Sequence, residues 1–304
     1  MDFLKGKSAA VSLGVIVSCL LAVSCMAQAP QSVPAEWKQV EGAMGRAGQM
    51  QPGDVLKFSM PRSDLKVTLG EVTIKPGLAL GSWVAFKRIG SEAMVMGDLV
   101  LIESEVNPVI SKLQEGGISE AALHNHLIGE SPRVMYLHVA SQGEAAKMAR
   151  AIHDALALTK TPGPSPQAAS SGLLEINQKQ IEQVLGKSGK VNGGILQFSV
   201  PRPEKINDDG TEIPSSMGVA TAINFQPVGK NRAAITGDFV LIAREVNPVI
   251  KALRENGIKV TALHSHMLTE EPRLFFMHFW AVDDASTLAR GLRSALNQIS
   301  TARK

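Results

Sequence analysis

Apolar residues alternate in some stretches of this chain and recur at helical spacing in others, which predicts a mixture of strands and helices. Residues 55–60 alternate as a half-buried strand does, and residues 82–102 read as an antiparallel pair that turns at Gly90. Beyond this pair, Asn107 offers a capping side chain and Pro108 suits the first helical position. We therefore expect a helix to begin there.

The pattern continues with a second hairpin and a second helix. Residues 118–128 and 133–140 read as its two strands. Ser141 followed by Glu144 fits a capping box, which predicts the start of an alanine-rich helix that reaches Leu158. Interleaved antiparallel strands and helices of this kind are typical of an α+β fold.

The same pattern is then written a second time. Glu245-Val246-Asn247-Pro248 matches Glu105-Val106-Asn107-Pro108, an offset of 140 residues (245 − 105). We expect an α+β fold made of two tandem homologous repeats, each with an antiparallel sheet and two main helices. The repeats span residues 28–158 and 173–304, and the Pro/Ser/Gly-rich residues 159–172 link them. The pattern leaves open whether the repeats fold separately or share one sheet.

Composition narrows the class of protein. A chain of 304 residues with 44% hydrophobic and 19% charged residues can bury a substantial core. The net charge is only +3, aromatic residues make up 4%, and no basic tract is interleaved with stacking residues. We therefore expect no nucleic-acid partner.

The N-terminal segment is typical of a secretory signal. Two lysines precede an apolar run at residues 9–23, and Ala27 offers a small-residue cleavage site, so residues 1–27 are predicted to be a signal peptide. The protein is then exported, periplasmic or secreted. Alternatively, a loose lipobox makes Cys25 the site of a lipid anchor, the one route by which we expect membrane attachment. Cys19 and Cys25 are the only cysteines, so cleavage after Ala27 leaves no thiol.

Six of the seven histidines lie in a motif that both repeats contain. The two copies are Leu123-His124-Asn125-His126 with His138, and Leu263-His264-Ser265-His266 with His278. Residues i and i+2 of a strand share a face, and a three-residue turn at residues 130–132 places His138 opposite His124. Three imidazoles on one face form a facial ligand set that suits tetrahedral Zn²⁺ with one open position.

Neighbouring residues add alternatives for this site. Glu130 and Glu270 follow the histidines at a spacing that resembles the first half of the cupin metal motif, although the glycine pattern of that motif is missing. If the protein is an enzyme, these two glutamates are the candidate catalytic bases. Methionines near the histidines make copper a possible metal for this site. Zinc is the metal we expect first, ahead of copper or non-haem iron.

Four arginines each follow a proline: Arg62, Arg133, Arg202 and Arg273. Their forked donors suit an anionic ligand, for which Arg133 and Arg273 are the candidates beside the histidine motif, and salt bridges within each repeat explain them equally well. Glu105 and Glu245 read either as hydrogen-bond partners of a ligating histidine or as solvated charges at strand ends.

Two classes of function stay open at this point. One is a metal site that activates water for hydrolysis or hydration. The other is a non-enzymatic cell-envelope module that binds a small molecule or partner between the repeats, with the histidines as structural residues. No nucleophile elbow, phosphate loop or H-E-x-x-H motif is present, so serine hydrolases, nucleotide enzymes and zincins are not supported.

The repeated blocks G-D-[LF]-V-L-I, E-V-N-P-V-I and L-H-[NS]-H-x₃-E-x-P-R resemble the LppY/LpqO family, a bacterial exported domain of unknown function. The resemblance covers residues 37–296. It implies export and a domain used twice in one chain, and it supplies no catalytic residue.

Overall fold

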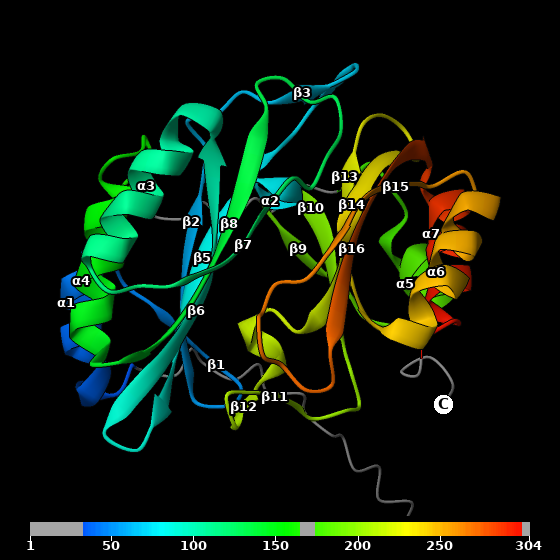
Figure 1. Ribbon diagram of the computed structural model, residues 1–304. Coiled ribbons are helices and arrows are strands. Elements are labelled where there is room, and N and C mark those ends of the chain that lie inside the picture. The colour runs from blue at the N-terminus through cyan, green and yellow to red at the C-terminus, as the bar shows by residue number, and fades with distance from the viewer. Residues whose placement is uncertain (1–32, 165–173, 300–304) are drawn as a thin grey trace, which may run out of the picture. The chain divides into compact units, whose positions relative to one another are not determined.

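Each repeat folds into an antiparallel sheet with helices on one face (Figure 1). The computed structural model describes residues 33–164 and 174–299. The predicted signal peptide and residues 165–172 of the predicted linker lie outside these ranges. The predicted α+β fold with two tandem repeats is confirmed. Among the described residues, no helix combines the length and apolarity needed to cross a membrane.

The first repeat contains the elements from η1 to α4. In chain order they are η1 (Ala35–Trp37), α1 (Lys38–Met44), β1 (Gln49–Gln51), β2 (Val55–Pro61), β3 (Thr68–Leu69), β4 (Val72–Thr73), α2 (Pro76–Ala79), β5 (Gly81–Ile89), β6 (Glu92–Ile102), α3 (Glu103–Glu115), β7 (Glu120–His124), β8 (Val134–Gly143) and α4 (Ala145–Leu156). Its main sheet has the order β1-β2-β5-β6-β8-β7. The predicted hairpin around Gly90 is confirmed as β5 and β6.

The second repeat contains the equivalent elements. They are α5 (Gln178–Leu185), β9 (Lys190–Asn192), β10 (Ile195–Pro201), β11 (Ile206–Asp208), β12 (Thr211–Ile213), η2 (Ser215–Met217), β13 (Ala220–Pro227), β14 (Arg232–Ile242), α6 (Ala243–Glu255), β15 (Lys259–His264), β16 (Leu274–Asp284) and α7 (Ala285–Leu296). Its main sheet has the order β15-β16-β14-β13-β10-β9. The repeats therefore form two separate sheets, which answers the question that the sequence pattern left open.

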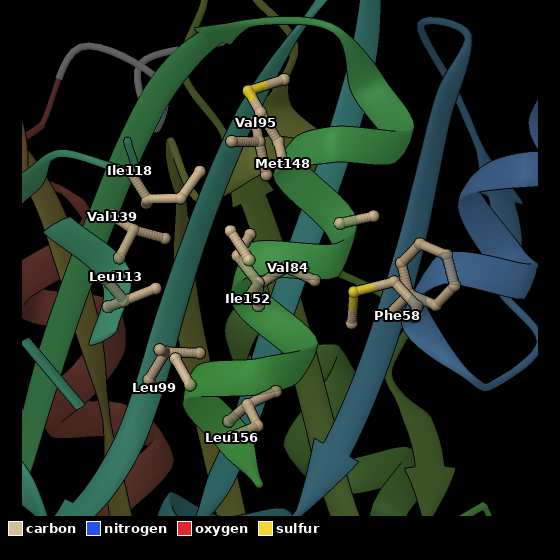
Figure 2. Packing of buried hydrophobic residues seen from close by; sticks show 14 of the residues in the cluster. Phe58, Val84, Val95, Leu99, Leu113, Ile118, Val139, Met148, Ile152 and Leu156 are labelled. Carbon is tan, nitrogen blue, oxygen red and sulfur yellow. The ribbon is translucent and has the colours of Figure 1, made fainter. Parts of the chain in front are cut away.

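Helices α1, α3 and α4 cover the outer face of one sheet and α5, α6 and α7 that of the other, whereas the short α2 lies between the sheets, whose inner faces pack against each other (Figure 1). Figure 2 shows the outer core of the first repeat, where Met148, Ile152 and Leu156 of α4 lie on Val84 and Leu99 of the sheet. These side chains have fractional exposures of at most 7%. Each outer core is built from one repeat alone.

Two further apolar clusters join the sheets, and both contain residues of both repeats. In one cluster Val55 packs with Val240 and Phe276, and in the other Ile195 packs with Val100 and Tyr136. Exchanging the repeats turns one set into the other, because these residues are counterparts in the repeated pattern. The inner faces thus meet in an isologous way, as the two subunits of a two-fold dimer do.

The helix after β6 begins before the predicted residue. Its first residue is Glu103, so Asn107 and Pro108 lie inside the helix and the predicted start at Asn107 is wrong. The cap comes from Glu105, whose Oε2 accepts a hydrogen bond from the Ile102 backbone N–H at 3.0 Å. A carboxylate that already satisfies the first turn makes the Asn107 side chain unnecessary there.

The predicted capping box at the start of α4 is also wrong, because Ser141 is not the residue that caps this helix. Glu144 is itself the N-cap and accepts hydrogen bonds from the backbone N–H groups of Ala146 and Lys147 at 2.8 and 2.9 Å. Ser141 still belongs to β8, and its Oγ accepts from the Ser119 backbone N–H at 2.8 Å. The strand continues past Ser141 because Val95 pairs with it in the ladder.

A buried arginine ties the end of the sheet to the helix cap in each repeat. Arg62 is fully buried, and its Nη1 donates to the Val100 carbonyl at 2.7 Å and to Glu105 Oε2 at 2.8 Å. Arg202 makes the equivalent pair with Glu245 at 2.7 Å. The prediction of salt bridges within each repeat is confirmed for both arginines. The predictions that these two glutamates are histidine partners or solvated charges are wrong.

Substituting Arg62 by alanine is expected to destabilise the fold by about 3–5 kcal/mol, because Glu105 is left buried without its cation. Urea unfolding followed by circular dichroism measures this difference. Lys112→Ala is the control, since Lys112 pairs with Glu115 at an exposed position and its loss should change the free energy of unfolding little. Equal effects of the two substitutions would contradict the structural role of Arg62.

Candidate metal centre

The histidine motif lies on the last two strands of each sheet. His124 is the final residue of β7, His126 lies two residues beyond it, and His138 is in the middle of β8. In the second repeat His264 ends β15 and His278 lies in β16, with His266 again two residues beyond the strand. Four of the six candidate ligands therefore lie on the edge strand of each sheet and its neighbour, and His126 and His266 lie in the connections that follow the edge strands.

The register of the β7–β8 pair differs from the predicted one. His138 lies opposite Ala122, and His124 lies opposite Tyr136, so the predicted pairing of His124 with His138 is wrong. The connection spans residues 125–133 and is longer than the three-residue turn assumed. The register shift is two residues (138 − 136), and side chains alternate with a period of two, so the imidazoles stay on the same face. The predicted triad of His124, His126 and His138 is brought together despite the shift.

The two triads meet face to face between the sheets. His124 stacks on His264 with ring centroids 3.5 Å apart. His126 stacks on His278 at 3.6 Å, and His138 stacks on His266 at 3.7 Å. Exchanging the repeats turns the second stack into the third and leaves the first unchanged. The six imidazoles thus form one cluster, which we call the histidine cluster, around an approximate two-fold axis.

The histidine cluster contains two sets of donors close enough to share a metal ion. One set is His124, His126 and His138, and the other is His264, His266 and His278 together with His124. Within each set the ligand atoms lie within 4.8 Å of one another. Two nitrogen ligands of a tetrahedral zinc ion are ~3.3 Å apart. His264 Nε2 and His266 Nε2, at 2.8 Å, need to separate by only about half an ångström to reach that geometry.

Several buried ring nitrogens of the cluster have no hydrogen-bond partner among the described residues. Buried nitrogens without a hydrogen bond among the described residues are His124 Nε2, His126 Nε2, His138 Nε2, His264 Nδ1 and His278 Nε2. His278 donates Nδ1–H to the Gly237 carbonyl at 2.7 Å, and His124 Nδ1 lies 3.1 Å from the Asn125 carbonyl. A backbone carbonyl at Nδ1 fixes the neutral tautomer that presents the Nε2 lone pair, as in metal-ligating histidines.

Burial keeps these histidines neutral. It lowers the pKa of His124 to about 4, against the opposing hydrogen bond to Asn125, and lowers the pKa of His278 to about 3. The pKa values of His126, His138 and His266 are also lowered, first by burial and then by the neighbouring imidazoles. Neutral imidazole is the form that binds a metal ion, so the cluster does not have to release protons first.

Two aspartates that the sequence analysis did not select lie beside the cluster. Asp98 Oδ1 is 3.8 Å from His138 Nε2, and Asp238 Oδ2 is 3.8 Å from His266 Nε2. Oδ1 of each aspartate is buried without a hydrogen-bond partner. Burial raises the pKa of Asp98 to about 8 and also raises that of Asp238. The sequence does indicate them, because a Gly-Asp pair recurs at the centre of an apolar strand in both repeats. A buried carboxylate is costly, so its presence in such a strand points to a functional role.

A cleft of about 750 Å³ between the two sheets leads to the cluster. Four of the histidines line it, namely His126, His138, His266 and His278, and both aspartates do so too. Much of the remaining wall is polar and includes Ser59, Gln197, Ser199, Asn224 and Thr236. The size is that of a site for a small molecule, and the two repeats contribute jointly to it.

Lys57 is a cation in this cleft that the second repeat does not reproduce. Its Nζ donates to the Ser216 carbonyl at 3.0 Å and lies 4.0 Å from the ring centroid of Trp83. Burial lowers the pKa of Lys57 to about 8, although the charge of Asp98 acts in the opposite direction. The counterpart of Lys57 is Gln197, so the two ends of the cleft differ.

The predicted catalytic glutamates are engaged in the turns that follow the histidines. Glu130 Oε1 accepts from the Val134 backbone N–H at 3.3 Å, and Glu270 Oε1 accepts from the Leu274 backbone N–H at 2.9 Å. Neither belongs to the donor sets or lines the cleft. A catalytic role for them stays a prediction that this placement does not favour.

The predicted ligand-binding arginines lie outside the cleft as well. Arg133 is exposed and 3.7 Å from Glu103, while Arg273 is half-exposed and donates to Glu270 at 3.1 Å. Neither lines the cleft. Binding of an anion by them stays a prediction. His153, the seventh histidine, is beside Asp154 on α4, away from the cluster.

A family model described as "Domain of Unknown Function (DUF1259)" matches residues 38–158 and 179–298. The chain belongs to this family. Its domain occurs twice here, and each copy contains one histidine triad. The family description names no activity. No curated protein matches the chain.

Similar solved structures are microcompartment shell proteins at low similarity. The double-ringed trimeric shell protein MSM0271 from the RMM microcompartment has 10% identity over 69% of this chain and 84% of its own, with a TM-score of 0.20. The trimeric bacterial microcompartment shell protein PduB has 14% identity over 84% of this chain and 92% of its own, with a TM-score of 0.20. EtuB from Clostridium kluyveri has 10% identity over 82% of this chain and 87% of its own, with a TM-score of 0.19. Such TM-scores do not indicate a shared fold, and nothing about this chain follows from them.

Lys57 should titrate earlier than the exposed lysines. Pulse acylation of amines between about pH 6 and about pH 10, read by mass spectrometry, is expected to give a midpoint near 8 for Lys57. Lys112 is the control, because its hydrogen bond to Glu115 raises its pKa. The same midpoint for both lysines would contradict the effect of burial on Lys57.

Proposed function

We propose that this protein is a metal-dependent protein that binds a divalent ion, by preference Zn²⁺, in the histidine cluster and uses it to activate water for hydrolysis or hydration. The observation that carries the proposal is the presence of two histidine donor sets, in each of which the ligand atoms lie within 4.8 Å of one another. Five buried ring nitrogens of these histidines have no hydrogen-bond partner among the described residues. A buried polar atom without a partner costs about 1–3 kcal/mol, so a metal ion bound at these nitrogens would stabilise the cluster.

The donor set supports zinc. Imidazole and carboxylate are borderline-to-hard ligands, and the described residues contain no cysteine that would add a thiolate. Met277 packs in the outer core of the second repeat, whereas Met267 lies in an inner cluster and lines a small pocket with His138 and His266, so copper stays the alternative metal. Three imidazoles with an adjoining cleft match the arrangement of catalytic zinc sites, in which a fourth position stays open.

The cleft supports chemistry on a small molecule. A bound divalent ion supplies Lewis acidity and lowers the pKa of a water molecule. Asp98 and Asp238 lie beside the imidazoles and line the cleft, whereas Glu130 and Glu270 do not line it, so the two aspartates are the acidic groups next to the proposed ion. The amide and hydroxyl side chains of the walls suit a polar substrate.

A non-enzymatic function is the second candidate, and the cleft itself favours it. A pocket of this size between two repeats can hold a small ligand without any reaction. This candidate expects the histidines to act as structural residues, so that protein without metal is as stable as protein with metal. The metal measurement below separates the two functions.

Elemental analysis of protein purified without an affinity tag or added metal should find zinc or another divalent ion. Its content should fall in His126→Ala and His266→Ala and stay unchanged in His153→Ala, because His153 lies outside the cluster. Removing the metal should lower the melting temperature, since an ion at 1,000 times its dissociation constant stabilises by about 4 kcal/mol. Absence of metal, with none taken up on titration, would contradict the proposal and favour the second candidate.

We further propose that the protein is exported, as its N-terminal pattern and its resemblance to the LppY/LpqO family suggest. Expression of the full chain in a bacterial host followed by intact-mass analysis is expected to give a mature protein that begins at Gln28. A mass that corresponds to a lipid-modified Cys25 would contradict soluble release and establish the anchor instead. An unprocessed chain would contradict export.

A further inference from the structure

We propose that the histidine cluster holds two metal ions, one on each triad, and that Asp98 and Asp238 complete the two sites. This inference rests on the proposed function and goes beyond it in the number of ions and in the role of the aspartates. It makes the cluster a two-metal centre, in which a substrate oxygen can contact both ions.

The approximate two-fold symmetry of the cluster is the first argument. Exchange of the repeats turns one triad into the other, and the stacks of His126 on His278 and His138 on His266 have almost equal separations of 3.6 and 3.7 Å. Any arrangement that suits an ion in the first triad therefore has an equivalent in the second. The first triad forms one donor set, and the second triad forms the other together with His124.

The distance between the triads is the second argument. An imidazole binds a metal ion in the plane of its ring, so two stacked rings serve two ions that are separated by about the stacking distance. The three stacks between the triads have centroid distances of 3.5, 3.6 and 3.7 Å. Metal ions in two-metal sites lie about 3.5–4 Å apart. The spacing of the triads therefore fits two ions.

The positions of the aspartates are the third argument. Each triad has its own carboxylate, with Asp98 at 3.8 Å from His138 Nε2 and Asp238 at 3.8 Å from His266 Nε2. That distance is too long for a hydrogen bond. Donors on one zinc ion are ~3.0–3.6 Å apart, so a small movement of each side chain turns these neighbours into co-ligands.

The charges of the cleft agree with this assignment. The buried Oδ1 of Asp98 and the buried Oδ1 of Asp238 have no hydrogen-bond partner among the described residues. Lys57 is the cation that acts on Asp98, and its Nζ donates to the Ser216 carbonyl. Buried carboxylates are stable in proteins when they are paired or coordinate a metal. Two divalent ions, one on each triad, supply the missing positive charge.

The test is a titration of the chelator-treated full-length protein with zinc sulfate, followed by isothermal calorimetry and by metal analysis after gel filtration. Wild type is expected to bind two equivalents. Asp98→Asn and Asp238→Asn should each weaken one of the two sites by at least about tenfold, while Asp154→Asn is the matched control beside the isolated His153 and should retain both.

The histidine variants separate one shared ion from two. His126→Ala removes a ligand of the first triad only, so it should leave one tight equivalent, and His266→Ala should do the same for the second triad. Cobalt(II) loaded to two equivalents should show a coupled electron paramagnetic resonance signal that is absent at one equivalent.

Three results would overturn parts of this picture in distinguishable ways. One equivalent in wild type, lost in both histidine variants, contradicts the two-ion inference and leaves the proposed function intact. Two equivalents that neither aspartate variant weakens contradict the role of Asp98 and Asp238. No binding at all contradicts the proposed function itself. The aspartate variants preserve side-chain volume, so they decide the question if a histidine variant fails to fold.

Discussion

Six imidazole rings held between two apolar sheet faces are the constraint on which the rest of this structure depends. The sheets bury one another through two clusters of aliphatic and aromatic side chains, and the histidines lie in the same interface. Removal of these rings from water raises the free energy of the folded state unless their nitrogens find partners. The outer cores, the helix caps and the buried arginines hold the strands that carry the rings. The interface between the sheets therefore determines both the stability of the fold and the geometry of the histidine cluster.

The aromatic neighbours of the cluster show how tightly the rings are fixed. Tyr136 stacks on His126 with centroids 3.3 Å apart, and Phe276 stacks on His266 at 3.6 Å. The Tyr136 hydroxyl donates to the Ala79 carbonyl at 2.7 Å. A ring held on one side by an aromatic face and on the other by a second imidazole has little rotational freedom. Such rigidity preorganises ligands and lowers the entropic cost of binding an ion.

The repeat could be predicted from the sequence because matching residues recur 140 positions apart. The α+β class and the shared face of the histidines could be predicted because they rest on short-range periodicity. The i, i+2 spacing of His124 and His126 fixes their common face whatever the fold. His138 stayed on that face although the predicted register was off by two residues, since an even shift leaves the face unchanged. Local helix starts were less predictable, because Glu105 and Glu144 provided caps where Asn107 and Ser141 were expected.

The merging of the two triads could not be predicted, because no local pattern indicates which sheet faces pack together. An inward Asp98 looks the same in the sequence whether it meets solvent, a salt bridge or another repeat. Arg62 and Arg133 both follow a proline, yet the first is fully buried and the second is exposed. Such differences arise from contacts between residues far apart in the chain.

The isologous packing of the repeats has a consequence for how this site can change. In a homodimer of single repeats, every substitution would appear on both sides of the two-fold axis. A covalent tandem keeps the halves together at high effective concentration and lets each vary alone. Lys57 and Tyr136, which line the cleft, correspond to Gln197 and Phe276 in the second repeat, and only Gln197 of these two lines it. Because the two repeats can differ, a nearly symmetric histidine cluster has an asymmetric entrance. A molecule that enters the cleft meets a cation at one end and an amide at the other.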